Sequence, residues 1–270
     1  MGGTATWVRR AAGTFVECAC LAAIVAIPLL FNARADRAFE EPKVLLLRAL
    51  ASVILSGLVV WIAADGRTVS RIAKRPAWRV PLLAPLLLLA GAYAVSTAFS
   101  ISPHVSFWGA YRRTQGLYTW LSYVAVFVAI LLVAHRREHT ERVVTMAILS
   151  SVPAAVYGIV QHFGGDPLRW DPGGDRIGRI VGTAGNPIFF SAFLIMVVPV
   201  TLARLIRHAM EAGVARTNGP ALLARTHRRL AATYALVLGA QTLSIVYARS
   251  LGPLLGLGAG LTLFGLGAIH

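Results

Sequence analysis

The chain has 270 residues, of which 57% are hydrophobic and only 14% are charged. Soluble globular chains carry about 25% charged residues, so this composition excludes an ordinary soluble domain with a polar surface. The formal net charge is +15, but the basic residues stand in short clusters between long apolar runs, which favours a membrane protein and argues against nucleic-acid binding. The only cysteines, Cys18 and Cys20, share one apolar run and exclude a disulfide framework.

The first apolar run covers residues 11–31 and follows Arg9 and Arg10, as in a secretory signal peptide. It is long enough to span a bilayer, and no convincing cleavage site follows it. We therefore expect a first transmembrane helix that is retained.

Seven further apolar runs follow, each close to the roughly 20 residues that a bilayer core requires. Backbone groups in lipid must be hydrogen-bonded internally, and these continuous Leu, Ala, Val and Ile stretches lack the alternation of barrel strands. The sequence therefore predicts an all-α polytopic bundle of about eight transmembrane helices, a single domain over residues 1–270. The later helices are expected near 43–64, 80–99, 118–134, 142–162, 187–206, 230–248 and 252–269.

The distribution of Lys and Arg predicts the orientation. With the N-terminus inside, the inner segments hold more of the 26 basic residues than the outer ones, which places both termini in the cytoplasm. The inner segment 207–229 contains the turn signal Thr217–Pro220 and is predicted to be a basic loop lying on anionic lipid.

Each segment predicted on the outer side places a cation at a helix end. These segments are 32–42, 100–117, 163–186 and 249–251. Guanidinium groups bind phosphate through a planar fork, so cations that converge at headgroup depth would suit a phosphate or pyrophosphate group. The candidates for such phosphate binding are Lys43, Arg112, Arg113, Arg179 and Arg249.

Arg249 is the sharpest candidate, because it stands between two apolar runs with almost no loop, where a charge is costly without a partner or a task. Arg112 and Arg113 have an alternative role, in which they snorkel to lipid phosphates. Gly185 and Asn186 precede Pro187, where a helix N-terminus favours anions; Asn186 alternatively serves only as the N-cap.

Other polar residues point to structural roles. Glu17 lies inside the first run, and its pairing with Arg48 is favoured over a functional role. The seven histidines show no metal spacing such as H-E-x-x-H, and no phosphate-cradling G-x-x-x-x-G-K motif is present. We therefore expect no metal site and no cofactor.

Six motifs in order resemble the O-antigen ligase and O-antigen polymerase superfamily of bacterial membranes. In many members a helix ending in Y-G-x-x-Q precedes a D-P-x-x-W loop and a G-T-x-G-N-P turn, and a Ser-Arg-Gly motif follows, which appears here as Ala248–Ser250 with only the Arg kept. The resemblance rests on Phe39–Lys43, Tyr111–Gly116, Pro153–Gln161, Asp166–Trp170, Gly182–Pro187 and Tyr247–Gly258.

This resemblance implies a metal-independent, inverting glycosyltransferase. Such an enzyme moves a glycan from undecaprenyl pyrophosphate to an acceptor hydroxyl at the outer membrane face. Arg249 would stabilise the pyrophosphate leaving group, with Arg112, Arg113 and Arg179 as supporting contacts and Lys43 as a weaker one.

The chain departs from the superfamily at its end. Members continue with a large external loop and further helices that supply a catalytic His and another Arg, whereas this chain stops at His270, which is expected on the inner side. The resemblance then implies the N-terminal portion of an enzyme, a split subunit or a reduced relative, so enzymatic activity stays open. Two alternatives remain: a noncatalytic subunit of a larger membrane complex, and a small transporter, which would need polar residues aligned through the bilayer.

Overall fold

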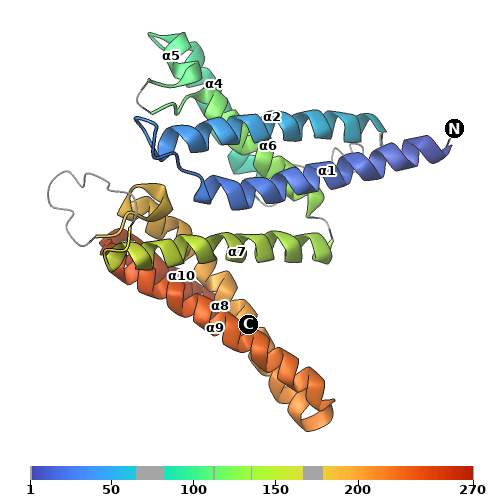
Figure 1. Ribbon diagram of the computed structural model, residues 1–270. Coiled ribbons are helices and arrows are strands. Elements are labelled where there is room, and N and C mark those ends of the chain that lie inside the picture. Colours follow the sequence, from blue (N-terminus) through green and yellow to red (C-terminus); the bar gives the residue numbers. More distant parts are fainter. Residues whose placement is uncertain (1, 65–81, 112, 135, 167–178, 270) are drawn as a thin grey trace. The chain divides into compact units, whose positions relative to one another are not determined.

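The computed structural model describes residues 2–64, 82–111, 113–134, 136–166 and 179–269. All regular structure in these ranges is helical (Figure 1). The helices are α1 (Gly2–Leu29), α2 (Glu40–Ala64), α4 (Leu83–Ala98), α5 (Pro103–Trp108), α6 (Leu117–Val133), α7 (Arg137–His162), the 3₁₀ turn η2 (Gly182–Ala184), α8 (Pro187–Asn218), α9 (Ala221–Ala248) and α10 (Leu251–Ile269).

The predicted all-α class is confirmed, and the protein is a polytopic helical membrane protein. Five helices in the described part of the chain, α1, α2, α7, α8 and α9, are long and apolar enough to cross a bilayer. The remaining predicted spans correspond to α4, α6 and α10, which are apolar but shorter, so the number of eight crossings stays a prediction.

The chain folds into two compact units. Unit 1 comprises Met1–Ile27 and Glu40–Val143, and unit 2 comprises Pro28–Phe39 and Val144–His270.

Unit 1 is built around α1, α2 and α6. Its core includes Val16 and Cys20 of α1, Ile54 of α2 and Ala129 of α6, all almost fully buried. A Cβ atom at Gly57 would lie 2.8 Å from Val16 Cγ2, so the absence of a side chain there lets α1 and α2 approach closely.

Unit 2 is built around α7, α8 and α9, with α10 packed on α8. Phe190 and Leu194 of α8 pack against Ile245 of α9 in its core. Buried hydrogen bonds also join the three helices: Gln241 Nε2 of α9 donates to Ser151 Oγ of α7 (2.7 Å) and to Thr201 Oγ1 of α8 (3.1 Å).

The prediction of a basic loop at 207–229 was wrong. Helix α8 continues to Asn218, α9 begins at Ala221, and the two lie side by side as a hairpin (Figure 1). At ~1.5 Å per residue, the 32 residues of α8 extend about 48 Å, beyond the roughly 30 Å hydrocarbon core. Ala, Leu, Met and Arg are strong helix formers, so the helices continue where the apolar run ends.

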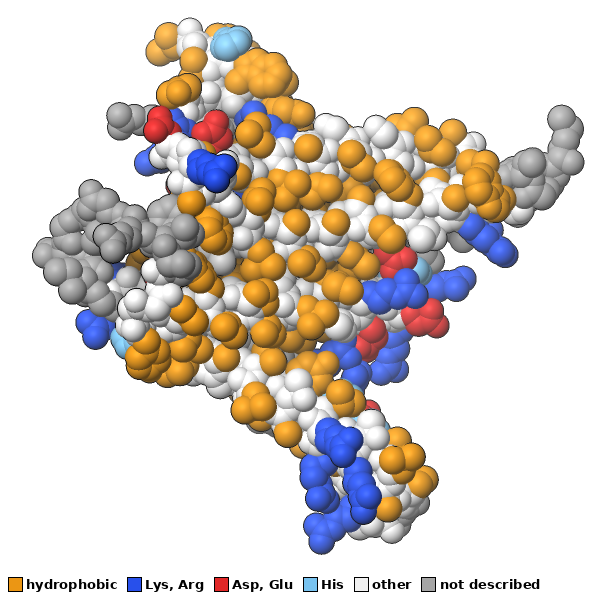
Figure 2. Space-filling view, in the orientation of Figure 1, with side chains coloured by type: hydrophobic (Ala, Val, Ile, Leu, Met, Phe, Trp, Pro, Cys, Tyr) orange, Lys and Arg blue, Asp and Glu red, His pale blue; other side chains and the backbone are white. Residues whose placement is uncertain are grey.

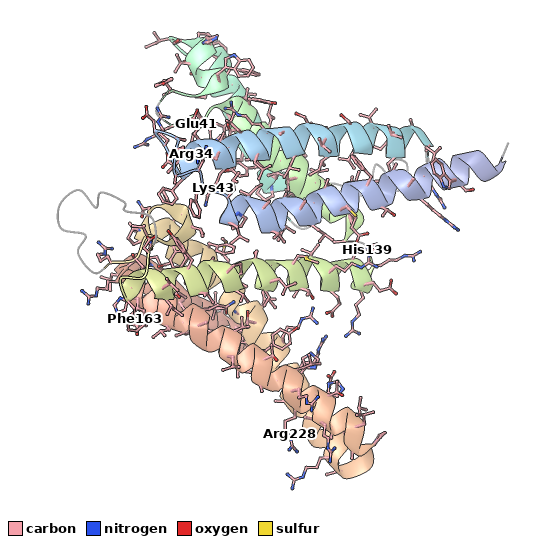
Figure 3. All side chains as sticks on the ribbon, in the orientation of Figure 1. Arg34, Glu41, Lys43, His139, Phe163 and Arg228 are labelled. Atoms are coloured by element: carbon pink, nitrogen blue, oxygen red, sulfur yellow. The ribbon has the colours of Figure 1, made fainter. Side chains whose placement is uncertain are left out.

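Basic side chains gather at the end of this hairpin (Figure 2). They include Arg216 near the end of α8 and three exposed arginines in the first turns of α9: Arg225, Arg228 and Arg229. Arg228 projects from the hairpin in Figure 3. The predicted contact of these residues with anionic lipid now concerns a helical surface instead of a loop.

The predicted pair between Glu17 and Arg48 was also wrong. Glu17 is buried, and its Oε1 lies 2.8 Å from Arg142 Nη1 and 2.8 Å from His139 Nδ1 of α7. Val16, the residue before Glu17 in α1, lies against Gly57 of α2. Glu17 therefore lies at about the same height as Gly57 along the α2 axis. Arg48 lies nine residues away from Gly57, about 13 Å along the helix axis, which is too far for an ion pair.

We expect Glu17→Gln to lower the free energy of unfolding by about 1–3 kcal/mol, because the buried carboxylate loses one charge-assisted hydrogen bond and leaves Arg142 without its counter-charge. The thermal unfolding midpoint in detergent measures the effect. Glu138→Gln, at an exposed position on the same α7 turn, is the matched control and should change the midpoint little. Equal midpoints for the two variants would show that the Glu17 contacts contribute nothing.

Candidate functional site

The predicted phosphate-binding residues are divided between the two units. Lys43 and Arg113 belong to unit 1, and Arg179 and Arg249 belong to unit 2 together with Gly185 and Asn186. Arg112 lies outside the described residues. The expected convergence of all five cations therefore stays a prediction, and each group is described within its own unit.

In unit 1, Arg48 organises the segment that carries Arg113. Its Nη2 donates to the carbonyl oxygens of Trp108 (2.7 Å) and Thr114 (2.9 Å), and its Nε donates to Thr119 Oγ1 (3.1 Å). The guanidinium also lies 4.9 Å from the ring centroid of Tyr118. This intramembrane charge is thus satisfied by backbone carbonyls, a role that the sequence did not indicate.

Arg113 and Lys43 take different positions in unit 1. Arg113 is exposed, one residue before Thr114, which adopts a left-handed φ of 49°. Lys43 is half-buried in the first turn of α2, where Figure 3 labels it.

In unit 2, the end of α7 is fastened to the segment that leads into α8. Gln161 Oε1 accepts hydrogen bonds from the backbone N–H groups of Val181 (3.1 Å) and Gly182 (2.8 Å), and its Nε2 donates to Asp166 Oδ2 (2.7 Å). Tyr157 also donates its hydroxyl to Asp166. The Tyr and Gln of the Y-G-x-x-Q motif thus share one carboxylate, and the Gln fixes the following turn.

The turn before α8 has the local structure that its sequence predicts. Asn186 Oδ1 accepts from the backbone N–H of Ile188 (2.8 Å), and Pro187 occupies the first helical turn, so the N-cap role of Asn186 is confirmed. Gly185 adopts φ 69°, and a Cβ there would lie 2.2 Å from Phe39 Cδ2, so Phe39 packs directly against the turn.

Arg179 connects this segment to the corner between α9 and α10. Its Nε lies 3.3 Å from the carbonyl oxygen of Ala248, and its Nη2 lies 3.3 Å from the carbonyl oxygen of Arg249 and from Ser250 Oγ. These hydrogen bonds occupy some of the guanidinium donors of Arg179. Arg179 therefore stabilises the corner and also places a positive charge beside it.

Arg249 forms the corner itself. It caps α9 in the left-handed conformation, with φ 48° and ψ 43°, and its side chain is exposed. Within the described residues, its guanidinium makes no hydrogen bond or ion pair, so its donors remain available to a ligand. A non-glycine residue in this conformation is uncommon, and such strain is often found at functional sites.

An aromatic stack borders the Arg249 corner. The ring of His162, at the end of α7, lies 3.6 Å from that of Tyr247 with an interplanar angle of 7°. His162 Nδ1 is buried and has no hydrogen-bond partner among the described residues. No local sequence pattern indicates this stack, which depends on how α7 and α9 pack.

No family model, curated protein or solved structure matches the chain. The structure therefore assigns the chain to the polytopic helical membrane proteins and shows an exposed arginine at a strained helix corner.

Proposed function

We propose that the chain binds the pyrophosphate of a lipid-linked glycan at the Arg179–Arg249 end of unit 2 and takes part in transferring that glycan to an acceptor hydroxyl. The resemblance to the O-antigen ligase and polymerase superfamily supplies the substrate class, undecaprenyl pyrophosphate carrying a glycan. In this proposal the Arg249 end faces the outer side of a bacterial inner membrane, and both termini face the cytoplasm.

The single observation that carries the proposal is the exposed guanidinium of Arg249 on a strained corner that Arg179 holds in place. Left-handed backbone costs a non-glycine residue about 1–2 kcal/mol, and an exposed corner gives no packing reason for an arginine. Glycine would relieve the strain at this position. An arginine at a position that glycine would occupy without strain favours a task for its charge.

The chemistry of the proposed glycan transfer also suits the guanidinium group of Arg249. Departure of a pyrophosphate concentrates negative charge, which fixed guanidinium groups stabilise without reorganising. In the proposal the Arg249 side chain, between the apolar helices α9 and α10, reaches the depth of lipid headgroups, where the pyrophosphate of a polyprenyl carrier also lies. The phosphate contacts that the resemblance implies for Lys43, Arg112 and Arg113 stay predictions from the sequence.

The test measures binding of undecaprenyl pyrophosphate to the full chain in nanodiscs by native mass spectrometry. Arg249→Gly should weaken binding roughly 10- to 100-fold, because a charged hydrogen bond to phosphate contributes about 1.5–3 kcal/mol. The same variant should unfold at a higher temperature than the unmodified chain, because glycine tolerates the left-handed corner. Loss of binding in a more stable protein therefore cannot be attributed to misfolding.

Two comparisons sharpen this test. Arg228→Ala removes an exposed arginine from the α8–α9 hairpin and should leave binding unchanged. Undecaprenol, which lacks the pyrophosphate, should bind equally to the Arg249→Gly and unmodified chains. If the pyrophosphate lipid also binds both chains equally, the role given to Arg249 is wrong, and the alternative of a noncatalytic membrane subunit becomes preferable.

A further inference from the structure

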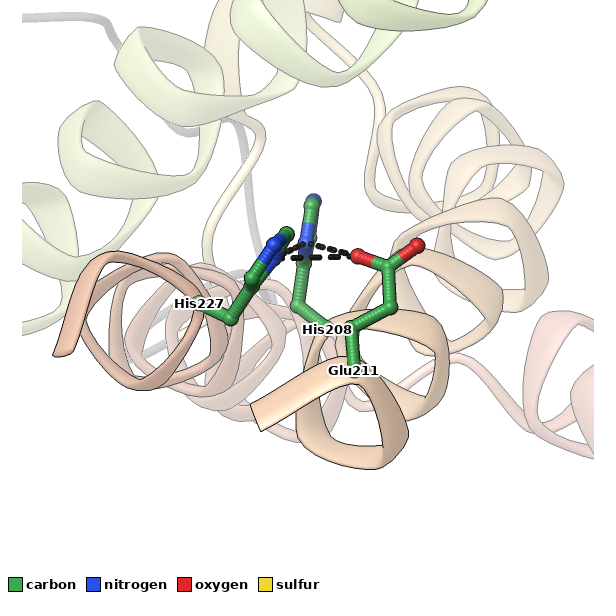
Figure 4. Close-up of side chains that lie close together, drawn as sticks. All are labelled: His208, Glu211 and His227. Atoms are coloured by element: carbon green, nitrogen blue, oxygen red, sulfur yellow. Dashed lines mark hydrogen bonds and ion pairs between the residues drawn. The ribbon is translucent and has the colours of Figure 1, made fainter. Parts of the chain in front are cut away.

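A second group of ligand-forming side chains lies within the α8–α9 hairpin. His208 and Glu211 are one turn apart on α8, and His227 reaches them from α9 (Figure 4). His208 is buried, whereas Glu211 and His227 are half-buried. His208 lies roughly 20 residues, or about 30 Å of helix, beyond Pro187, so this group is about a bilayer thickness away from the Arg249 corner.

We propose that His208, Glu211 and His227 bind a divalent transition-metal ion, with Zn²⁺ as the ion that best suits this set of ligands. The proposal is independent of the proposed glycan function, because it concerns other residues at the opposite end of unit 2. It departs from the sequence-based expectation of no metal site.

The geometry of three atoms carries the inference. His208 Nδ1 lies 3.1 Å from His227 Nδ1 and 3.1 Å from Glu211 Oε2, and His227 Nδ1 lies 3.0 Å from the same carboxylate oxygen. Three atoms about 3 Å apart fit around one cation at the bond lengths of roughly 2.0–2.2 Å that imidazole nitrogens and carboxylate oxygens form with zinc.

No placement of protons on the two imidazoles makes all three of these short contacts favourable. If both imidazoles carry a proton on Nδ1, each can donate to the carboxylate, but the two N–H groups then face each other at 3.1 Å. If only one does, the lone pair of the other nitrogen faces the carboxylate oxygen at about the same distance. A cation at the centre makes all three contacts favourable, because each atom then offers it a lone pair.

The surroundings prepare these side chains for binding. The ring of Tyr234 stacks on His208, with centroids 5.5 Å apart and an interplanar angle of 8°, and so fixes the orientation of that imidazole. Arg207 Nε lies 4.0 Å from the other carboxylate oxygen, Glu211 Oε1, which leaves Oε2 directed at the histidines. The neighbouring Arg204 is buried and Arg207 is half-buried, and their charges oppose a cation. Coordination by three ligand atoms at bond distance acts against this repulsion.

Two histidines and a carboxylate form a recognised zinc ligand set that leaves a fourth position for water or another ligand. An ion bound there would tie α8 to α9 where the hairpin extends past the apolar run. It would thereby also fix the position of the basic residues at the hairpin end.

The test uses the full chain, purified without a histidine tag and stripped of metal by a chelator, and titrates it with Zn²⁺ against a chromophoric competitor. We expect one ion per chain at micromolar affinity or better. His208→Ala, His227→Ala and Glu211→Gln should each weaken binding at least about tenfold, because each removes one of three ligands. Co²⁺ should give the visible absorption of a low-symmetry site in the unmodified chain and in none of these three variants.

His104→Ala, at an exposed histidine of unit 1, is the matched control and should bind Zn²⁺ as the unmodified chain does. Circular dichroism of the metal-free variants checks that the hairpin is helical, and Glu211→Gln keeps the shape of the side chain should an alanine variant fail to fold. A stoichiometry near zero, or equal affinities for the control and the three ligand variants, would overturn the proposal.

Discussion

Replacing Gly182 with Ala should destabilise unit 2 by about 2–5 kcal/mol. Gly182 adopts φ 55°, which costs an alanine about 1–2 kcal/mol. An added Cβ would also lie 2.2 Å from Cδ2 of Phe190, and overpacking of a core costs about 1–3 kcal/mol more. Phe190 is 1% exposed and packs against other core side chains, so it has little room to move away.

Two other glycines separate these contributions. Gly164 has φ 74° but nothing within 4 Å of an added Cβ, so Gly164→Ala should show the backbone cost alone. Gly213 lies in α8 with similarly open surroundings and no positive φ, and Gly213→Ala should stabilise the chain by about 0.5–1 kcal/mol. Denaturant midpoints in a fixed detergent rank the three variants, and a Gly182→Ala midpoint no lower than that of Gly164→Ala would refute the predicted clash.

Removing the Arg48 side chain should release the segment from Trp108 to Thr119. Arg48→Leu removes the charged donor from two carbonyl oxygens and from Thr119 Oγ1, and hydrogen bonds to charged groups contribute about 1.5–3 kcal/mol each. The Thr114 carbonyl keeps its hydrogen bond from Thr119 Oγ1 (2.7 Å). Leucine is also easier than arginine to place in a membrane helix, so α2 itself should remain inserted. The expected result is therefore local: amide hydrogen exchange in this segment rises roughly 30-fold or more.

The comparison variants for Arg48 test the geometry. Arg48→Lys keeps the charge but lacks the planar fork, so it should restore only part of the protection. Arg113→Leu changes an exposed arginine in the same segment and should leave exchange near that of the unmodified chain. Unchanged exchange in Arg48→Leu would mean that the segment is held by its aromatic packing, including the stacked rings of Phe107 and Tyr118.

The helices themselves were largely predictable. Apolar runs with few charges give the helical class directly, because the backbone must bond internally in lipid. The prediction was wrong at 207–229, where a turn signal among basic residues indicated a loop. A run of Arg, Ala and Leu remains a good helix in water, and only Gly219 and Pro220 interrupt it.

Part of the candidate site was also local enough to predict. Asn186 before Pro187 specifies an N-cap through neighbouring backbone groups, and it is observed as one. The unusual place of Arg249 was evident because two apolar runs left no room for a loop. The support that Arg179 gives this corner joins residues about 70 positions apart, and no local pattern indicates it.

The sequence by itself determined that this is a multi-pass helical membrane protein, where most of its helices lie, and which arginine stands at a helix corner. These properties depend on residues that are neighbours along the chain. The tertiary structure decided the partners of Glu17 and Arg48, the Gln161 contacts and the meeting of His208, Glu211 and His227. Such contacts depend on how far one helix is rotated and shifted along its axis relative to another. Rotation and shift are set by the packing of whole helix faces, so they cannot be predicted from the residue pattern of one helix.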